Sequence, residues 1–147
     1  MYKRLLVPVD GSELSLRAMT ESVELAAQLG AAVIGFVVEA LPPVPASAVP
    51  LAHYEEEVAA HDAKTEAHAH QVLERFAQQA AQRQVAFEAH LDHDDDVAGA
   101  IARAAESRGA DLIVMVTHGR SSFGELLFGS QTKNVMTRTK LPLLVLH

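Results

Sequence analysis

Short apolar segments alternate along the chain with longer stretches in which apolar residues recur every three or four positions. The short segments are typical of strands, and they occupy residues 4–9, 32–38, 85–91, 111–116 and 141–146. The segment at 85–91 alternates apolar and polar residues, which indicates a strand nearer a sheet edge. The longer stretches predict four helices, beginning near Glu13, His53, Val97 and Ser130.

The predicted helices carry recognisable end signals. Ser12 and the carboxylates of Asp94 to Asp96 can cap helix starts, and Gly30 and Gly109 supply stops. Residues 41–50 contain four prolines, so we expect a surface loop there. In the long helix that follows this loop, we expect a buried stripe made of Val58, Thr65, Val72 and Phe76, with Leu73 and Ala80 alongside.

Strict alternation of strands and helices predicts an α/β fold. The expected architecture is a single domain over residues 1–147, with three layers and a five-stranded parallel sheet between helices. In open sheets of this kind, ligands bind beyond the carboxyl ends of the strands, where the strand order reverses. That rule directs attention to Asp10, to Val37 and Val38, and to the loop after Val116.

Composition narrows the class of protein. The chain has no cysteine, which excludes disulfides and thiolate chemistry, and its net charge of -7 disfavours a nucleic-acid or anionic-membrane surface. The apolar segment near the start is too short for a signal peptide, and no segment approaches the ~20 residues that span a bilayer. We therefore expect a cytoplasmic protein that binds neither nucleic acid nor membrane.

The loop between Thr117 and Gly129 has the composition of a phosphate-binding segment. Gly119, Gly124 and Gly129 would let a ligand approach the backbone, and Ser130 opens a helix whose free N–H groups face the loop. Arg120, Ser130 and Thr132 can add charge and hydroxyl donors. A solvated turn explains the same glycines, so both interpretations stay open at this point. The P-loop and dinucleotide-binding glycine patterns are both missing.

Five motifs, in this order and spacing, make the chain similar to the universal stress protein family over nearly its whole length. They are Val7-Pro8-Val9-Asp10-Gly11-Ser12, Gly109-Ala110-Asp111-Leu112-Ile113-Val114-Met115, Thr117-His118-Gly119-Arg120, Leu127-Phe128-Gly129-Ser130 and Pro142-Leu143-Leu144-Val145-Leu146. The resemblance implies the Rossmann-like fold already derived. It also implies binding of ATP or AMP, with Mg²⁺ accompanying ATP.

The nucleotide-binding branch of that family uses the pattern G-x2-G-x9-G-[ST]. Gly119, Gly129 and Ser130 match it, whereas Val116 stands where the first glycine is expected. The resemblance implies that Asp10 meets the ribose or adenine, that the Val37 backbone bonds adenine, and that the matched loop positions hold phosphates. The implied binding set is Pro8, Val9, Asp10, Val37, Val116, His118, Gly119, Arg120, Gly129, Ser130, Gln131 and Thr132.

Val116 is the position at which the chain departs from this glycine pattern, and its backbone conformation determines whether the site is retained. A β-branched side chain resists positive φ, so a positive φ at this position would indicate that the site is lost. An extended backbone would mean only partial crowding. We expect binding to be retained.

Other candidate chemistry is weaker. Asp62, Glu66 and His70 share one helix face, but a solvated face explains them, and helix capping explains the aspartates between residues 92 and 96. We assign no metal site and no catalytic residue. The apolar segment from Leu141 to Leu146 needs cover as an edge strand. In the family, that strand pairs with its copy, which implies a homodimer.

The resulting hypothesis is a stress-response regulator that binds an adenine nucleotide. The nucleotide would order the loop from Gly119 to Gly129 and bias contacts with a protein partner that the sequence does not identify. Two alternatives stay open: a nucleotide-free dimeric interaction protein whose site Val116 has closed, and a slow ATP hydrolase in which His118 or Asp10 positions water.

Overall fold

The computed structural model describes residues 1–45, 48–117 and 130–147. Strands and helices alternate along this part of the chain, as predicted. The elements are β1 (Arg4–Pro8), α1 (Glu13–Leu29), β2 (Ala32–Glu39), α2 (Leu51–Gln82), β3 (Phe87–His93), α3 (Val97–Ser107), β4 (Leu112–Val116), α4 (Ser130–Arg138) and β5 (Leu143–Leu146). His118, Gly119, Arg120 and Gly129 lie outside the described residues.

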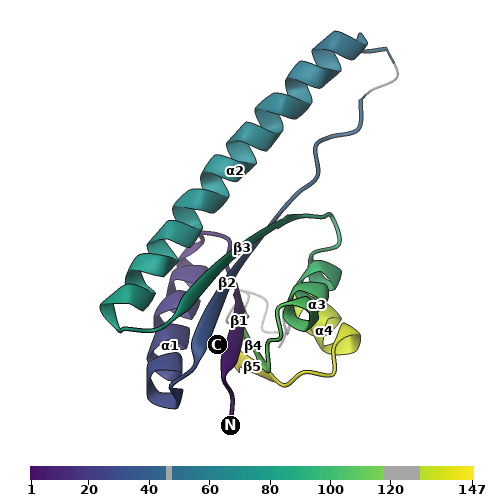
Figure 1. Cartoon of the computed structure of the whole chain (residues 1–147). Coiled ribbons are helices and arrows are strands. Elements are labelled where there is room, and N and C mark those ends of the chain that lie inside the picture. The colour runs from purple at the N-terminus through teal and green to yellow at the C-terminus, as the bar shows by residue number, and fades with distance from the viewer. Residues whose placement is uncertain (46–47, 118–129) are drawn as a thin grey trace.

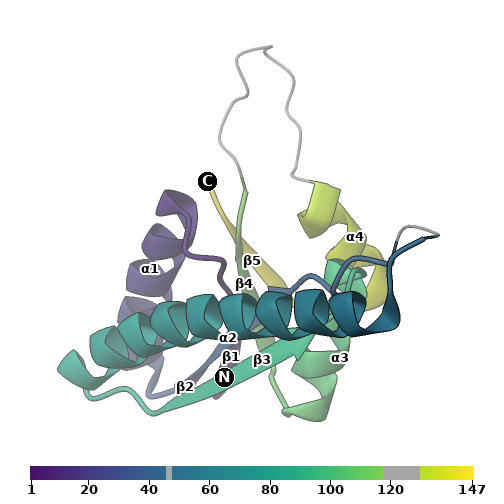
Figure 2. The same cartoon turned by 90° about the horizontal axis from the view of Figure 1, so that it is seen from above.

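The five strands form one parallel sheet in the order β3-β2-β1-β4-β5. Helices α1 and α2 cover one face, and α3 and α4 cover the other (Figures 1 and 2). The three-layer α/β prediction is therefore confirmed. β3 lies at an edge of the sheet, as its alternating pattern indicated.

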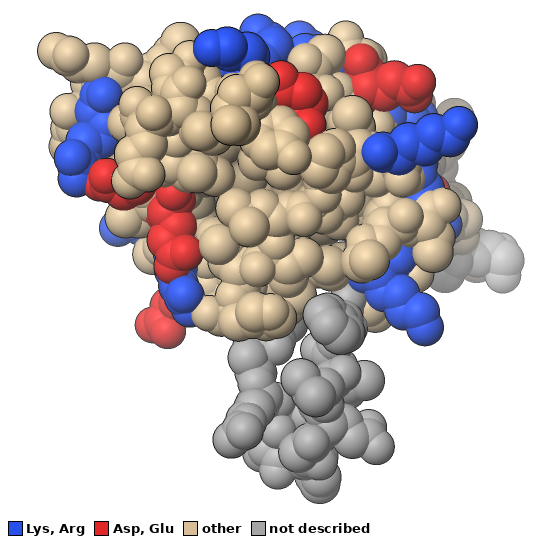
Figure 3. All heavy atoms as spheres, turned by 90° about the horizontal axis from the view of Figure 1, so that it is seen from below, with Lys and Arg blue, Asp and Glu red and all other residues tan. Residues whose placement is uncertain are grey.

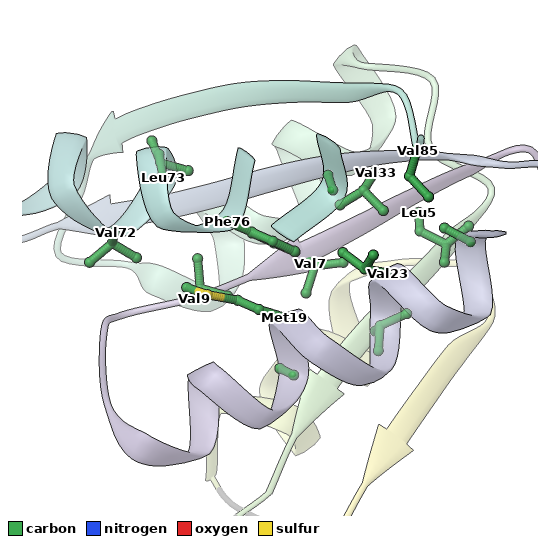
Figure 4. Close-up of a cluster of buried hydrophobic side chains, with 14 of the residues drawn as sticks. Leu5, Val7, Val9, Met19, Val23, Val33, Val72, Leu73, Phe76 and Val85 are labelled. Carbon is green, nitrogen blue, oxygen red and sulfur yellow. The ribbon is translucent and has the colours of Figure 1, made fainter. Parts of the chain in front are cut away.

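Two apolar cores hold the layers together. Successive β1 residues point to opposite faces, so Leu5 and Val7 enter the core under α1 and α2, while Leu6 enters the core under α3 and α4. Figure 4 shows the first core, in which Met19 and Phe76 meet the sheet from two different helices. Because β1 has buried neighbours on both faces, its position is the most strongly specified in the fold.

The ends of the helices follow the predicted signals. The Ser12 side chain accepts a hydrogen bond from Ser15 N at 3.3 Å, and Asp96 Oδ1 accepts one from Gly99 N at 3.2 Å. Gly30 ends α1 with φ at 62°, a left-handed conformation that favours glycine. These local signals therefore place α1 and α3 correctly.

The predicted stripe on α2 is wrong at its amino-terminal end. Val58 and Thr65 are only partly buried, and the buried residues of this helix are Ala69, Val72, Leu73, Phe76 and Ala80. A 32-residue helix is about 48 Å long, whereas a strand of seven or eight residues covers about 25 Å. The first half of α2 consequently extends beyond the sheet (Figure 1).

Several predicted strand boundaries shift by one or two residues. β5 begins at Leu143 rather than Leu141, β3 at Phe87 rather than Val85, and β1 ends at Pro8. Val85 bonds back to Ala80 O at 2.9 Å, so it closes the turn after α2 instead of joining the sheet. Apolar composition alone does not distinguish such a turn residue from the first residue of a strand.

The described surface has two further features. None of the described helices is long and apolar enough to cross a membrane. On the face shown in Figure 3, basic and acidic side chains of the described residues are interspersed. That distribution differs from the single-sign basic stripe expected of a nucleic-acid-binding face.

Candidate functional site

A cavity of about 170 Å³ opens beside the carboxyl ends of β1 and β4. The strand order reverses here. From β1 the chain continues to β2 and β3 on one side of the sheet, whereas β4 and β5 lie on the other side of β1. This is where open parallel sheets bind ligands. Five residues of the binding set predicted from the sequence line the cavity: Pro8, Val9, Asp10, Val116 and Gln131.

The turn after β1 forms one wall of the cavity through a compact hydrogen-bond network. Asp10 Oδ1 accepts from Ser12 N at 2.9 Å, and Ser15 Oγ accepts from Gly11 N at 2.9 Å. Ser15 Oγ in turn donates to Ser12 O at 3.0 Å. These bonds fix where the Asp10 carboxylate lies relative to the start of α1.

Gly11 is required in this turn for two reasons. Its φ is 85°, in the region that L side chains rarely adopt. A Cβ atom there would also lie 3.0 Å from Val72 Cγ2 and 3.2 Å from His68 Nε2, both on α2. The turn beside the cavity is thus packed directly against α2.

Asp10 carries its negative charge over a wide pH range. Partial burial tends to raise the pKa of its carboxyl group, but hydrogen bonds from Ser12 and Ser15 outweigh burial and hold the pKa below its usual value. An ionised carboxylate acts only as a hydrogen-bond acceptor. The cavity therefore presents a fixed acceptor suited to hydroxyl or amino donors.

Val116 is the last residue of β4, and its backbone is extended. It pairs in register with Leu146, and Thr117 N continues the ladder by donating to Leu146 O at 2.9 Å. Among the described non-glycine residues, only Gln84 has a positive φ. The Val116 side chain lines the cavity while packing on the core under α1 and α2. The Val116 side chain therefore narrows the cavity, while the Val116 backbone keeps the path of an ordinary strand.

The carboxyl end of β2 contributes Val38 to the cavity lining. The sequence directed attention to both Val37 and Val38, and the resemblance implied a role for the Val37 backbone alone. The Val37 side chain is instead buried in the core under α1 and α2. Neighbouring residues of a strand point to opposite faces, so a choice between them requires knowledge of which face adjoins the cavity. The implied hydrogen bond between the Val37 backbone and adenine does not involve this side chain, so it stays a prediction.

Three predicted site residues in the first turn of α4 lie in different surroundings. Gln131 lines the cavity, Ser130 is exposed at the start of the helix, and Thr132 is buried. Helical rotation of about 100° per residue explains why consecutive positions face different surroundings.

Most of the apolar residues that line the cavity were not predicted from the sequence. Leu14 and Ala18 come from α1, Val97 and Ile101 from α3, and Met115 from β4. Val97 and Ile101 pack on the core under α3 and α4. Both residues also line the cavity, because the parallel topology brings the starts of helices to the same edge of the sheet as the ends of strands. Ser12 and Ser15 also line it, through the turn described above.

Most of the His and Asp residues that suggested a metal site have other partners. Asp94 pairs with Arg103, and Asp96 pairs with Arg138 while capping α3. Hydrogen bonds from Arg138 and from Gly99 N lower the pKa of Asp96. His68 Nδ1 lies 2.7 Å from Glu39 Oε1. Across residues 1–45, 48–117 and 130–147, no group of three or more His, Asp or Glu side chains is arranged to hold a metal ion.

The fold and the cavity together define an open parallel α/β protein with a cavity at its topological switch point. The sequence model of the universal stress protein family matches residues 1–147, and the chain belongs to that family. Universal stress protein MJ0531 of Methanocaldococcus jannaschii is 30% identical over 99% of this chain and 82% of its own length. Universal stress protein MJ0577 of the same organism is 42% identical over 45 residues, which are 31% of this chain and 28% of that protein.

Solved structures of the family share the fold. The structure of MJ0577 superposes with a TM-score of 0.78, at 24% identity over 99% of this chain and 96% of the other. A universal stress protein in complex with cAMP gives a TM-score of 0.72, at 24% identity over 99% and 97% of the two chains. One from Archaeoglobus fulgidus in complex with dAMP gives 0.65, at 20% identity over 99% and 98%.

The lowered pKa of Asp10 predicts a pH-dependent contribution to stability. A carboxyl group whose pKa is lower in the folded state stabilises the fold above its unfolded pKa, and this contribution is lost as the pH falls through the folded pKa. Asp10→Asn should therefore cost stability at pH 7, and the difference from wild type should shrink below about pH 4. Urea unfolding at pH 7, 5 and 3 measures it.

Asp62→Asn is the matched control for this experiment, because it removes one carboxylate from the surface of α2. A wild-type advantage over Asp10→Asn that stays constant from pH 7 to pH 3 would show that the Asp10 charge is not stabilised by the turn.

Proposed function

We propose that this protein binds an adenine nucleotide, ATP or AMP, in the cavity at the carboxyl ends of β1 and β4. The observation that carries the proposal is the extended backbone of Val116, which leaves the cavity open at the position where the family pattern has glycine. Two relatives of the same fold were solved with cAMP and with dAMP, and this supports the same ligand class here.

The lining has the chemistry that a nucleoside requires. Val38, Val97, Ile101 and Met115 supply an apolar wall for a purine ring, and Asp10 supplies an acceptor for ribose hydroxyl groups. The cavity volume of about 170 Å³ is below the 300–1,000 Å³ of typical complete ligand pockets. We therefore assign the described cavity to the nucleoside part of the ligand.

The phosphates would extend from the nucleoside toward the start of α4. Gly119, Gly129 and Ser130 match the family's phosphate pattern, and the free N–H groups of a helix start favour an anion. His118 and Arg120 would join them, and Mg²⁺ bound with ATP would be held mainly by the phosphates. In this proposal the nucleotide orders the loop from Gly119 to Gly129 and thereby biases contacts with a protein partner.

The structure favours nucleotide binding over the two alternatives. Closure by Val116 would be expected from a positive φ, and the residue lies in a strand instead. For hydrolysis, Asp10 is the only ionisable side chain among the described residues that line the cavity. Its lowered pKa makes it a weak general base. We therefore propose binding without dedicated catalysis.

Calorimetric titration of the nucleotide-stripped protein with ATP and with AMP tests the proposal. We expect saturable binding in the micromolar range by the wild type. Val116→Gly should bind up to about tenfold more tightly, because removing the side chain relieves about 1.4 kcal/mol of crowding. Asp10→Asn should bind about tenfold more weakly, since a charged acceptor is replaced by a neutral one.

Asp62→Asn on α2 should bind like the wild type and serves as the control for Asp10→Asn. Binding by Val116→Gly alone would establish the alternative in which Val116 closes the site. Absence of binding by both proteins would refute a nucleotide site at this cavity.

We also propose that two chains associate through β5. This strand lies at the sheet edge opposite β3, and its outward-facing Leu144 is 36% exposed. Nearby on the chain, Met136 of α4 is 58% exposed. Pairing of β5 with its copy would cover an apolar edge that otherwise favours non-specific association.

Light scattering after size-exclusion chromatography tests this association. The wild type should elute as a dimer, and Leu144→Lys should elute as a monomer, because two lysines would face each other across the two-fold axis. Leu51→Lys changes another exposed apolar residue, at the start of α2, and should remain a dimer. A wild type that is monomeric at a concentration of about 10⁻⁴ M would contradict the proposal.

A further inference from the structure

After β2 the chain passes through a short proline-rich segment, residues 41–45, with the sequence Leu-Pro-Pro-Val-Pro. Proline fixes its own φ near −65°, and it restricts the preceding residue to extended ψ values. Three of the five residues are prolines and three directly precede a proline, so at least one of the two restrictions acts on every residue of the segment. The structure shows no helix or strand here. Polyproline II is the regular conformation that satisfies both restrictions.

Polyproline II has three residues per turn, so side chains three positions apart form a ridge along the segment. Leu41 and Val44 lie three positions apart on one ridge, and Pro42 and Pro45 lie on the next. Val44 is 88% exposed and Leu41 is 46% exposed. A P-x-x-P ridge beside an apolar ridge is the surface that aromatic-lined grooves recognise in extended ligands.

The start of the segment is anchored to the folded body. Leu41 N donates to Asp95 Oδ1 at 3.1 Å, and the preceding carbonyl, Ala40 O, accepts from His61 Nε2 at 2.9 Å. Figure 1 shows the chain leaving the end of β2 and running outward toward the distal end of α2. An anchored, stiff ligand loses little conformational freedom when it binds, which favours affinity.

The surroundings of the segment are acidic. No Lys or Arg occurs between Arg17 and Lys64 in the sequence. Asp95 lies at the start of the segment, and three exposed glutamates, Glu55, Glu56 and Glu57, lie near the start of α2. A partner that covers this region must therefore offer basic side chains around its groove.

We propose that residues 41–45 are a docking segment for a protein partner whose groove is lined by aromatic side chains and flanked by basic ones. The aromatic rings would hold the two prolines of the P-x-x-P ridge, and the basic side chains would meet the neighbouring carboxylates. This interaction does not depend on nucleotide binding, because none of the five residues lines the cavity beside β1 and β4.

Nuclear magnetic resonance titration of the full-length ¹⁵N-labelled protein tests the proposal. The probes are three purified proline-binding domains with basic groove margins: an SH3, a WW and an EVH1 domain. At least one should shift the amide signals of Leu41 and Val44 saturably, with a Kd below about 1 mM. Added salt should weaken binding, as charge complementarity requires.

The double variant Pro42→Ala/Pro45→Ala should weaken this binding at least about tenfold, since it removes the ridge and relaxes the backbone. Pro142→Ala is the matched control, because Pro142 precedes β5 at the opposite end of the parallel strands. The double variant should bind ATP like the wild type, so failure of either proposal is distinguishable from failure of the other. Absence of saturable shifts at Leu41 and Val44 with all three domains, or binding that survives in the double variant, would overturn the docking proposal.

Discussion

The central strand β1 is the element on which the rest of the structure depends. It is hydrogen-bonded to β2 on one side and to β4 on the other, and its Leu5, Leu6 and Val7 are fully buried. Because both neighbours are parallel to it, all three strands end at one edge of the sheet. The cavity beside Asp10 lies at this edge.

The turn that follows β1 links this cavity to the helices. Gly11 allows the chain to pass close to His68 and Val72 of α2, and the Ser12 and Ser15 bonds hold Asp10 at the cavity wall. On the opposite wall, Val116 keeps the extended geometry of β4 and narrows the space without closing it. The position of the cavity thus follows from the sheet, its negative charge comes from Asp10 in the turn after β1, and the Val116 side chain narrows it.

Much of this arrangement could be predicted from the sequence. Strong apolar periodicity identified every strand and helix, and the motif around Asp10 identified the cavity edge. The sequence could not predict whether Val37 or Val38 places its side chain in the cavity, because that depends on which face of β2 adjoins the cavity. Likewise, the partial exposure of Val58 and Thr65 follows from the length of the sheet that α2 crosses, a tertiary property. The backbone angle at Val116 was left open, because the residue ends a predicted strand and stands where the family pattern has glycine.

A crystal structure of the protein with AMP would test the central claim most directly. We expect the purine to lie against Val38 and Ile101 and the ribose hydroxyls to lie within hydrogen-bond distance of the Asp10 carboxylate. Val116 should keep its extended backbone beside the sugar. A nucleotide bound at another place on the molecule, or a cavity without nucleotide at saturating AMP, would contradict a nucleotide site at the switch point of the sheet.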